Sequence, residues 1–370
     1  YPQLDCKAVM LYPIEKKEKR TVRRKCAVRF LFGGKGLRIL KYEISSKWAG
    51  STIESFLRGE HGISSRILTQ LKKSPTGIMR NGVHARTVDR LCLGDILRLE
   101  LPEEEAPVLV PSDIPVEVVY EDEDILIFDK PAGMPCHPAK RYQQDTLANV
   151  FAAHARKNGE AVVFRPVNRL DRNTTGLVIA AKNPYAASVL GEQVRHHGEM
   201  TKEYLAIAQG IFPPALRQGR IEAPIRRLNE RSTIRVVASE GEGQYAVTDY
   251  RVIAQGSNAA MVAVRLGTGR THQIRVHFSY IGHPLLGDDL YGGEQSLAQF
   301  QMLRCYRIQL RHPVTGRLLS FVKPYEKELW RVAQAAGIAL GGLEQGLQDL
   351  SFTESTDSLP NLFIESPPFL

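Results

Sequence analysis

One carboxylate in this sequence stands in a setting that is common for catalytic groups. Asp171 lies within Arg-Leu-Asp-Arg at 169–172, and the small polar segment Thr-Thr-Gly at 174–176 follows it. Residues 177–181 are apolar and typical of a buried strand. This order predicts a charged side chain on a loop at the mouth of a sheet, where a rigid framework can present it to a ligand.

Histidines and cysteines do not indicate a metal site. His272 and His277 are close in sequence, but no carboxylate or cysteine accompanies them at ligand spacing, so we expect them to make hydrogen bonds within a helix. The five cysteines are scattered and form no C-x-x-C pair, which favours reduced thiols over disulfides or zinc. We therefore predict no metal site.

Length, charge and hydropathy limit the class of protein. A chain of 370 residues exceeds the usual size of one domain, so we expect a main domain and an accessory module. No apolar run approaches the roughly 20 residues that span a bilayer, and the basic start lacks the features of a secretory signal. We expect a cytoplasmic monomer without a membrane partner.

The net charge of +9 favours a polyanionic partner, although many basic runs are only solvated surface.

The sequence pattern of residues 37–101 predicts a small α+β module that follows a basic extension at 1–36. Ser51 or Thr52 can cap one short helix and Ser64 a second. Asn-Gly at 81–82 is a strong hairpin signal, because both residues tolerate positive φ. The module also carries a set of basic side chains: Arg58, Arg66, Lys72, Lys73 and Arg80.

A larger domain is predicted at 116–338, after a proline-punctuated linker at 102–115. Its fold class is α+β, with a mostly antiparallel mixed sheet and flanking helices. Helices are expected from Pro184 and near the end of the domain, and residues 339–370 have the composition of a disordered tail. The expected strands are 116–120, 125–129, 177–181, 203–208, 247–254, 261–266, 302–310 and 318–322.

The segment around Asp171 also resembles a known motif. Asn-Arg-Leu-Asp-Arg-Asn-Thr-Thr-Gly at 168–176 is similar to the central motif of the RluA-type pseudouridine synthases, usually His-Arg-Leu-Asp followed by Thr-Ser-Gly. Asn168 and Thr175 depart from that pattern. Asn can make similar loop hydrogen bonds and Thr keeps the hydroxyl, so we expect these changes to tune activity and not to abolish it.

Further segments agree with this family in order and spacing. Residues 129–138 resemble its entry motif, 201–206 the strand with its active-site tyrosine, and 269–277 its third catalytic motif. Segments 282–288 and 291–293 complete the set, so the resemblance covers roughly residues 116–325. The region 37–101 is similar to an RNA-binding module first known from a ribosomal small-subunit protein.

The resemblance implies an isomerase that converts specific uridines in RNA to pseudouridine without a cofactor. The base nitrogen separates from ribose, the uracil rotates, and carbon 5 rejoins the sugar. Asp171 would act as a nucleophile at the anomeric carbon or assist proton loss from the neighbouring ribose carbon, and both routes stay open. Tyr204 would stack on the uracil and could take the proton from carbon 5.

A cationic partner is expected beside Asp171. Arg275 is the first candidate, because Ile274, Phe278 and Ile281 would face the core and direct Arg275 off that apolar stripe. Arg270 is the competing candidate. Further substrate contacts implied by the resemblance involve Arg169, which would fill the space of the extruded base, together with Arg270, Thr174, Lys202 and His272. The basic residues of the module would contact RNA.

Large-subunit ribosomal RNA is the favoured substrate, and transfer RNA is the alternative. A second hypothesis is a noncatalytic RNA-binding protein or ribosome assembly factor, against which the presence of Asp171, Tyr204 and Arg275 argues. A third is a nucleoside hydrolase of the retaining-glycosidase type, which needs two carboxylates. Only Asp288 and Asp289 could supply the second.

Overall fold

The computed structural model describes residues 38–101, 109–139, 142–160, 163–195, 199–239, 241–341 and 347. The predicted basic extension at 1–36 lies outside the described residues, as does much of the predicted linker. Of the predicted disordered tail, only 339–341 and 347 are described.

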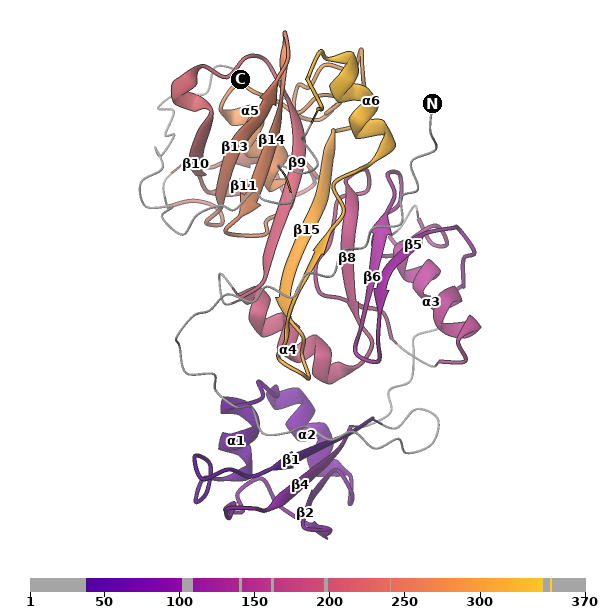
Figure 1. Cartoon of the computed structure of the whole chain (residues 1–370), viewed down its shortest axis with the longest axis vertical. Helices are drawn as coiled ribbons and strands as arrows, with labels where there is room; N and C mark the ends of the chain where they lie inside the picture. Colours follow the sequence, from indigo (N-terminus) through magenta and orange to yellow (C-terminus); the bar gives the residue numbers. More distant parts are fainter. Residues whose placement is uncertain are drawn as a thin grey trace.

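Residues 38–101 form a small sheet with two helices, drawn in indigo and violet in Figure 1. Thr52 and Ser64 accept the hydrogen bonds that begin the helices, as predicted, and Asn81 and Gly82 make the predicted turn with φ of 51° and 83°. The sheet order is β1-β4-β2-β3. The elements are β1 (Arg38–Glu43), α1 (Ile53–Gly59), α2 (Ser65–Lys73), β2 (Ile78–Arg80), β3 (Val83–His84) and β4 (Ile96–Leu101).

A ten-stranded sheet forms the centre of the larger part of the chain. Its main path is β10-β13-β14-β9-β15-β8-β6-β5, with β7 paired to β8 and β16 paired to β15. The β8–β15 pair is parallel and the other described pairs are antiparallel, which confirms the predicted α+β class. The strands are β5 (Glu117–Glu121), β6 (Ile125–Lys130), β7 (Arg165–Pro166), β8 (Thr175–Ala181), β9 (Thr201–Gln209), β10 (Gln218–Glu222), β13 (Val247–Gln255), β14 (Ala259–Leu266), β15 (Leu303–Arg311) and β16 (Leu318–Val322).

Four helices accompany this sheet, and a short hairpin stands beside it. In Figure 1 α3 lies outside β5 and β6, while α4 lies between the large sheet and the small module. The helix α3, the strands β7 and β10 and the hairpin were not predicted from the sequence. The strands were missed because they are short and lack alternation. These elements are α3 (Leu147–Lys157), α4 (Pro184–Arg195), α5 (Gln273–Tyr280), α6 (Lys327–Ala335) and the hairpin strands β11 (Ile225–Arg227) and β12 (Arg235–Val237).

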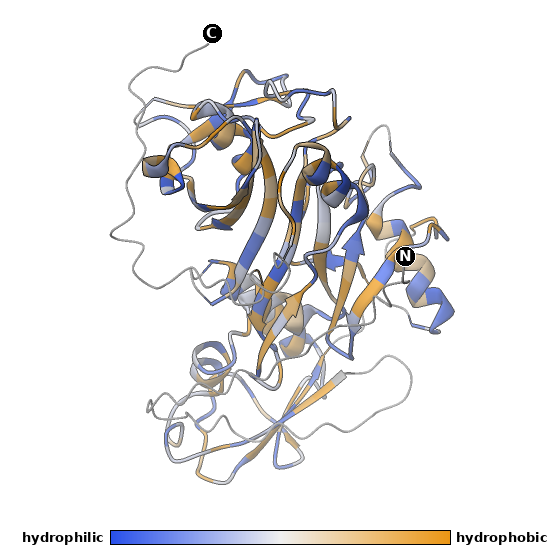
Figure 2. Cartoon of the chain, turned by 45° about the horizontal axis from the view of Figure 1, so that its top comes forward, coloured by the Kyte–Doolittle hydropathy of each residue, from blue (hydrophilic) through white to orange (hydrophobic). Residues whose placement is uncertain are grey.

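Strand β8 is buried along its whole length and leads directly out of the loop that carries Asp171. Figure 2 shows hydrophobic residues along the strands of the large sheet, where the main core lies. At the start of β8, Gly176 has φ +108°, and a Cβ there would stand 2.2 Å from the Cys305 carbonyl oxygen. Only glycine allows β8 and β15 to approach so closely.

The small module packs against α4 of the larger part. Tyr185 and Val314 belong to the same buried cluster as Tyr42 of β1. The Ser188 hydroxyl on α4 donates a hydrogen bond of 3.1 Å to the Gly62 carbonyl in the module. The two parts therefore share an apolar contact as well as a polar one.

Candidate active site

A row of paired residues crosses the large sheet below the Asp171 loop. Lys130 of β6 pairs with Gly176 of β8, Gly176 with Cys305 of β15, and Cys305 with Tyr204 of β9. Neighbouring strands lie about 4.8 Å apart, so the row from Lys130 to Tyr204 spans roughly 15 Å. The loop that carries Asp171 enters β8 at this row and therefore lies over the middle of the sheet.

The Asp171 carboxylate is 25% exposed and faces two cationic or polar side chains of the α5 region. Its Oδ2 lies 3.5 Å from Nη1 of Arg275 and 3.9 Å from Nε2 of His272. The backbone of the loop turns back at once, since the Thr174 N–H donates to the Asp171 carbonyl at 3.1 Å. The carboxylate thus combines access to solvent with a fixed backbone.

Arg275 is buried and held by a second carboxylate. Its Nε and Nη2 donate to the two oxygens of Asp288 at 2.7 and 2.6 Å, and its guanidinium lies 5.0 Å from the centre of the Tyr291 ring. Burial alone lowers the pKa of Arg275, but the hydrogen bond and charge of Asp288 and the charge of Asp171 raise it above its usual value. The side chain is a permanent cation fixed in one orientation.

These contacts correct two expectations. Arg275 lies off the apolar stripe of α5, yet it is only 4% exposed, because Asp288 neutralises it inside the protein. Asp288 is not a free carboxylate: it is fully buried and bonded to Arg275. It cannot serve as the second catalytic acid of a retaining glycosidase.

His272 connects Asp171 to the β11–β12 hairpin. Its backbone is left-handed with φ 58°, and its Nδ1 lies 2.8 Å from the Tyr291 hydroxyl. That hydroxyl accepts the Arg235 N–H at 2.9 Å, so its own proton can go to Nδ1 of His272. Burial, together with the charges of Arg275 and Arg235, lowers the pKa of His272. This arrangement favours a neutral ring whose Nε2–H is directed at Asp171.

A buried lysine and a cysteine both contact the backbone of the loop that carries Asp171. The Lys130 ammonium donates to the carbonyls of Pro131, Met134 and Arg172 at 2.8, 2.9 and 2.9 Å. Cys136 Sγ lies 3.5 Å from both the N–H and the carbonyl oxygen of Leu170. Backbone groups on both sides of Asp171 are therefore anchored.

Asn168 fastens the start of the same loop to β8. Its Oδ1 accepts the Ile179 N–H at 2.9 Å, and its Nδ2 donates to the Leu177 carbonyl at 3.1 Å. The side chain thereby bridges backbone groups of the strand that follows the loop.

Replacing Lys130 by methionine tests the anchoring. Lys130→Met removes the donor from three carbonyls, of which that of Met134 is buried and those of Pro131 and Arg172 are partly buried, and a buried unsatisfied group costs about 1–3 kcal/mol. We expect the free energy of unfolding to fall by roughly 2–4 kcal/mol, measured by urea denaturation. Lys327→Met, at an exposed lysine on α6, is the control and should change little. Equal stability of the two variants would refute the anchoring role.

Tyr204 lies on the floor of the site and is 5% exposed. Burial, with smaller contributions from Cys305 and Asp171, raises the pKa of Tyr204 well above its usual value. Its hydroxyl therefore stays protonated at neutral pH. The ring can still provide a flat apolar surface, but a phenolate base is not available there.

The other expected substrate contacts lie at different depths. Arg169 and Arg270 are exposed, and Arg270 donates to the Tyr245 carbonyl at 3.0 Å, so Arg275 and not Arg270 lies beside Asp171. Lys202 is half-buried, and burial lowers its pKa. Thr174 is 2% exposed, and its hydroxyl accepts a hydrogen bond from Gln301 at 3.2 Å. This hydroxyl therefore stabilises the loop.

The basic residues of the module are dispersed over its surface. Arg58 and Lys72 both approach Glu54, at 3.4 and 3.6 Å, and Arg80 donates to the Arg90 carbonyl at 2.6 Å. Lys73 is exposed near the end of α2. Arg66 differs from these residues, because it faces the contact with the larger part of the chain.

His277 is structural. Its Nε2 donates to the Ala223 carbonyl at 2.9 Å and its Nδ1 accepts from the Thr248 hydroxyl at 2.9 Å. Burial lowers the pKa of His277 to about 4. Both ring nitrogens are occupied by the fold, as we expected from its place in a helix.

The lowered pKa of His277 predicts a pH dependence of stability. The unfolded chain protonates this ring near pH 6.5, but the folded chain does so only near pH 4, so the unfolded state binds more protons between these values. Stability should therefore fall by roughly 3 kcal/mol as the pH drops from 6.5 to 4, through this group alone. Urea denaturation at both pH values should show a smaller loss for His277→Gln. An identical loss in wild type and variant would contradict the assignment.

One group of described residues has the spacing of metal ligands. Asp122, Asp124 and His312 place one ligand atom each within 4.8 Å of one another. These side chains already satisfy each other and their neighbours: His312 bonds to Asp122 at 2.9 Å, and Asn183 donates to Asp124 at 2.8 Å. The group closes the β5–β6 turn and plays no part at Asp171.

Sequence reasoning missed three members of this site. Asp288 was noted only as a free acid, while Lys130 and Tyr291 were noted only within their motifs. Two of them left a signal in the sequence, because a lysine that ends an apolar strand and an acidic pair after a glycine both require partners when they are buried. Which partner each one finds depends on the sheet register and could not be read from the chain.

Comparisons with known proteins agree on one family. Residues 124–280 match the family model described as RNA pseudouridylate synthase. An uncharacterised RNA pseudouridine synthase of Bacillus subtilis, YjbO, is 35% identical over 272 residues, which cover 73% of this chain and 94% of that protein. The ribosomal large subunit pseudouridine synthase D of Zymomonas mobilis is 39% identical over 240 residues, 61% of this chain and 74% of the relative.

A solved structure shares the fold. Human RNA pseudouridylate synthase domain containing 1 superimposes with a TM-score of 0.51 at 24% identity, over 65% of this chain and 96% of that one. In the part of the chain that the structure describes, no helix is both long and apolar enough to cross a membrane.

Proposed function

This chain belongs to the RNA pseudouridylate synthase family, isomerases that act on RNA, and we propose that its substrate is large-subunit ribosomal RNA, with Asp171 as the catalytic carboxylate. The relatives named ribosomal large subunit pseudouridine synthase D support this choice of RNA. The observation that carries the choice of Asp171 is its position. It is a partly exposed carboxylate on an anchored loop, 3.5 Å from a buried guanidinium.

The reaction requires little beyond such a carboxylate. The bond between N1 of uracil and C1′ of ribose breaks, a bond between C5 and C1′ forms, C5 loses its proton and N1 gains one. Asp171 either attacks C1′ or removes a proton from C2′, and both routes begin with the carboxylate close to the ribose. The fixed guanidinium of Arg275 orients that carboxylate toward the open side of the loop.

In this proposal the other residues bind and orient the nucleotide. Tyr204 forms a flat wall for the uracil ring, and its protonated hydroxyl can donate a hydrogen bond to the base. Taking the C5 proton would require Tyr204 to pass on its own proton at the same time. His272 presents Nε2–H between Asp171 and the bound ribose. Arg169, exposed on the loop that carries Asp171, would fill the space that the extruded base leaves.

The small module and the exposed basic residues would bind the surrounding RNA. Phosphate contacts by lysine and arginine supply affinity without reading sequence, so the module increases residence on RNA more than it selects the uridine. We propose Arg58, Lys72, Lys73 and Arg80 for such contacts, because their side chains lie at the surface of the module or close to it.

Chemical mapping tests the substrate. Ribosomal and transfer RNA lacking modifications would be incubated with the protein, treated with a carbodiimide and read by reverse transcription, which stops at pseudouridine. We expect new stops in large-subunit ribosomal RNA. Stops confined to transfer RNA would reject the proposed substrate while leaving the activity intact, and an absence of stops in both would favour the noncatalytic RNA-binding hypothesis.

A further inference from the structure

A cavity of about 460 Å³ lies between the small module and the larger part of the chain. Helix α2 of the module forms one wall, and α4 with the start of β7 forms the other. The described residues that line it include three arginines: Arg66, Arg165 and Arg195. The mechanism at Asp171 uses none of them.

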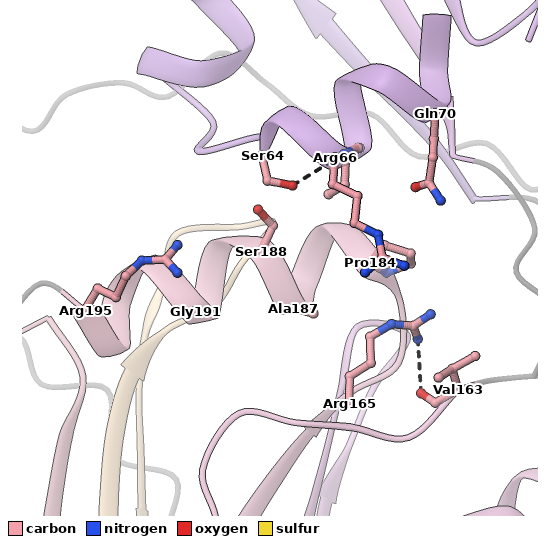
Figure 3. Close-up of a pocket in the computed structure, with 11 residues that line it drawn as sticks. Ser64, Arg66, Gln70, Val163, Arg165, Pro184, Ala187, Ser188, Gly191 and Arg195 are labelled. Atoms are coloured by element: carbon pink, nitrogen blue, oxygen red, sulfur yellow. Dashed lines mark hydrogen bonds between the residues drawn. The ribbon is translucent and has the colours of Figure 1, made fainter. Parts of the chain in front are cut away.

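Two of these arginines converge from different parts of the chain. Figure 3 shows Arg66 extending from α2 and Arg165 extending toward it from the larger part, beside Pro184 at the start of α4. Burial first, and the positive charge of Arg66 second, lower the pKa of Arg165 to about 10. Each charge therefore raises the positive potential at the other. An anion placed between them is attracted by both guanidinium groups.

The third arginine is engaged elsewhere. Arg195 forms a two-point ion pair with Glu192 on the exposed side of α4. Arg66 and Arg165 supply the other positive charges at the cavity, and Nη1 of Arg165 donates to the Val163 carbonyl at 3.0 Å. Gln70 on α2 adds an amide that can donate a further hydrogen bond.

We propose that Arg66 and Arg165 together clamp one phosphodiester group of the substrate RNA in this cavity. The inference rests on the proposed function and names a contact of the RNA outside the catalytic centre. Arginine suits it, because the planar guanidinium binds phosphate oxygens through paired hydrogen bonds. Since one arginine comes from each part of the chain, the bound phosphate also ties the module to the catalytic domain.

The position of the clamp identifies which part of the RNA it binds. Arg165 pairs with Ala181, at the opposite end of β8 from the Asp171 loop. Strand residues rise about 3.3 Å each, so the two ends of β8 are roughly 20 Å apart. The clamp cannot hold the extruded uridine itself. It holds flanking RNA backbone that runs from the catalytic domain toward the module.

The test compares RNA binding of the full chain and four variants. The variants are Arg66→Gln, Arg165→Gln, the double substitution, and Arg331→Gln as a matched control at an exposed arginine on α6. The probe is a transcript of large-subunit ribosomal RNA, titrated between about 50 and 200 mM salt. Each variant is also assayed for pseudouridine formation on the same transcript.

We expect the double variant to lose the salt dependence of one phosphate contact. The slope of log affinity against log salt should fall by about 0.7–0.9, and affinity should weaken by about 10- to 100-fold. Either single variant should give most of this effect, because both arginines hold the same phosphate. Arg331→Gln should match wild type.

A double variant with the wild-type slope and affinity would overturn the clamp. Arg66→Lys with Arg165→Lys should keep the slope, and a loss of slope there would also reject the clamp by indicating damage to the module contact. A wild-type protein that forms no pseudouridine would refute the proposed function, whereas the slopes would still decide the clamp.

Discussion

Asp171→Asn should abolish pseudouridine formation while RNA binding and folding stay intact. The amide keeps the size and the hydrogen-bonding shape of the carboxylate, but it can neither attack C1′ nor accept a proton from C2′. We expect turnover to fall by at least about 10³-fold, measured under single-turnover conditions with saturating protein. Affinity for RNA should change by less than about threefold, because the clamp and module contacts are untouched.

Asp289→Asn is the matched control for this variant. Asp289 lies 4.0 Å from the same Arg275 guanidinium, but it is 60% exposed and makes no bidentate pair. It should retain wild-type turnover. Substantial turnover by pure Asp171→Asn protein would remove Asp171 from the catalytic role, and equal losses in both variants would indicate a general effect of charge at the site.

Asp288→Asn should destabilise the protein by about 3–5 kcal/mol. The substitution leaves the Arg275 guanidinium buried without its bidentate carboxylate, and an uncompensated buried charge of this kind carries a cost of that size. Urea denaturation measures the change. Turnover should also fall, because Arg275 no longer holds its orientation beside Asp171.

Removing both charges separates stability from chemistry. Arg275→Met with Asp288→Leu replaces the pair by apolar groups of similar volume, which is often neutral or stabilising. We expect the double variant to recover most of the stability that Asp288→Asn loses. Its turnover should stay about 10²-fold below wild type, because Asp171 has lost its cationic partner. Wild-type turnover in the double variant would show that Arg275 does not orient the catalytic group.

Local signals in the sequence predicted much of the fold. Thr52 and Ser64 begin their helices through side-chain hydrogen bonds, and Asn81-Gly82 adopts the positive φ values that its hairpin needs. The long apolar strands β8, β9 and β14 were predicted within one or two residues. The short strands β7 and β10 were missed, because a few residues carry no period and depend on the neighbour that they pair with.

The candidate site was predictable in its residues but not in its connections. The motifs indicated Asp171 and Arg275, and the structure brings the two together. The pairing of Arg275 with Asp288 and the three carbonyls around Lys130 depend on chain segments that are distant in sequence. Such contacts depend on sheet register and on how the loops close. Neither can be predicted from the local pattern of a single sequence.

The contact between the module and the larger part could not be predicted at all. Tyr185 on α4 reads as one more apolar residue of an amphipathic helix, but it packs in the module's cluster with Tyr42. Arg66 reads as one of several surface cations, but it faces Arg165 across the cavity. The contacts of both side chains become apparent only in the three-dimensional arrangement of the two parts of the chain.

Release of tritium from RNA labelled at C5 of uridine would measure catalysis by Asp171 directly. Forming the new bond from C5 to C1′ displaces the hydrogen at C5, so each pseudouridine made in labelled ribosomal RNA frees one tritium atom into water. We expect tritium release by the wild-type protein from RNA that stays intact in length, and only background release by Asp171→Asn. No release from ribosomal or transfer RNA by the wild-type protein, or equal release by Asp171→Asn, would contradict the catalytic role of Asp171.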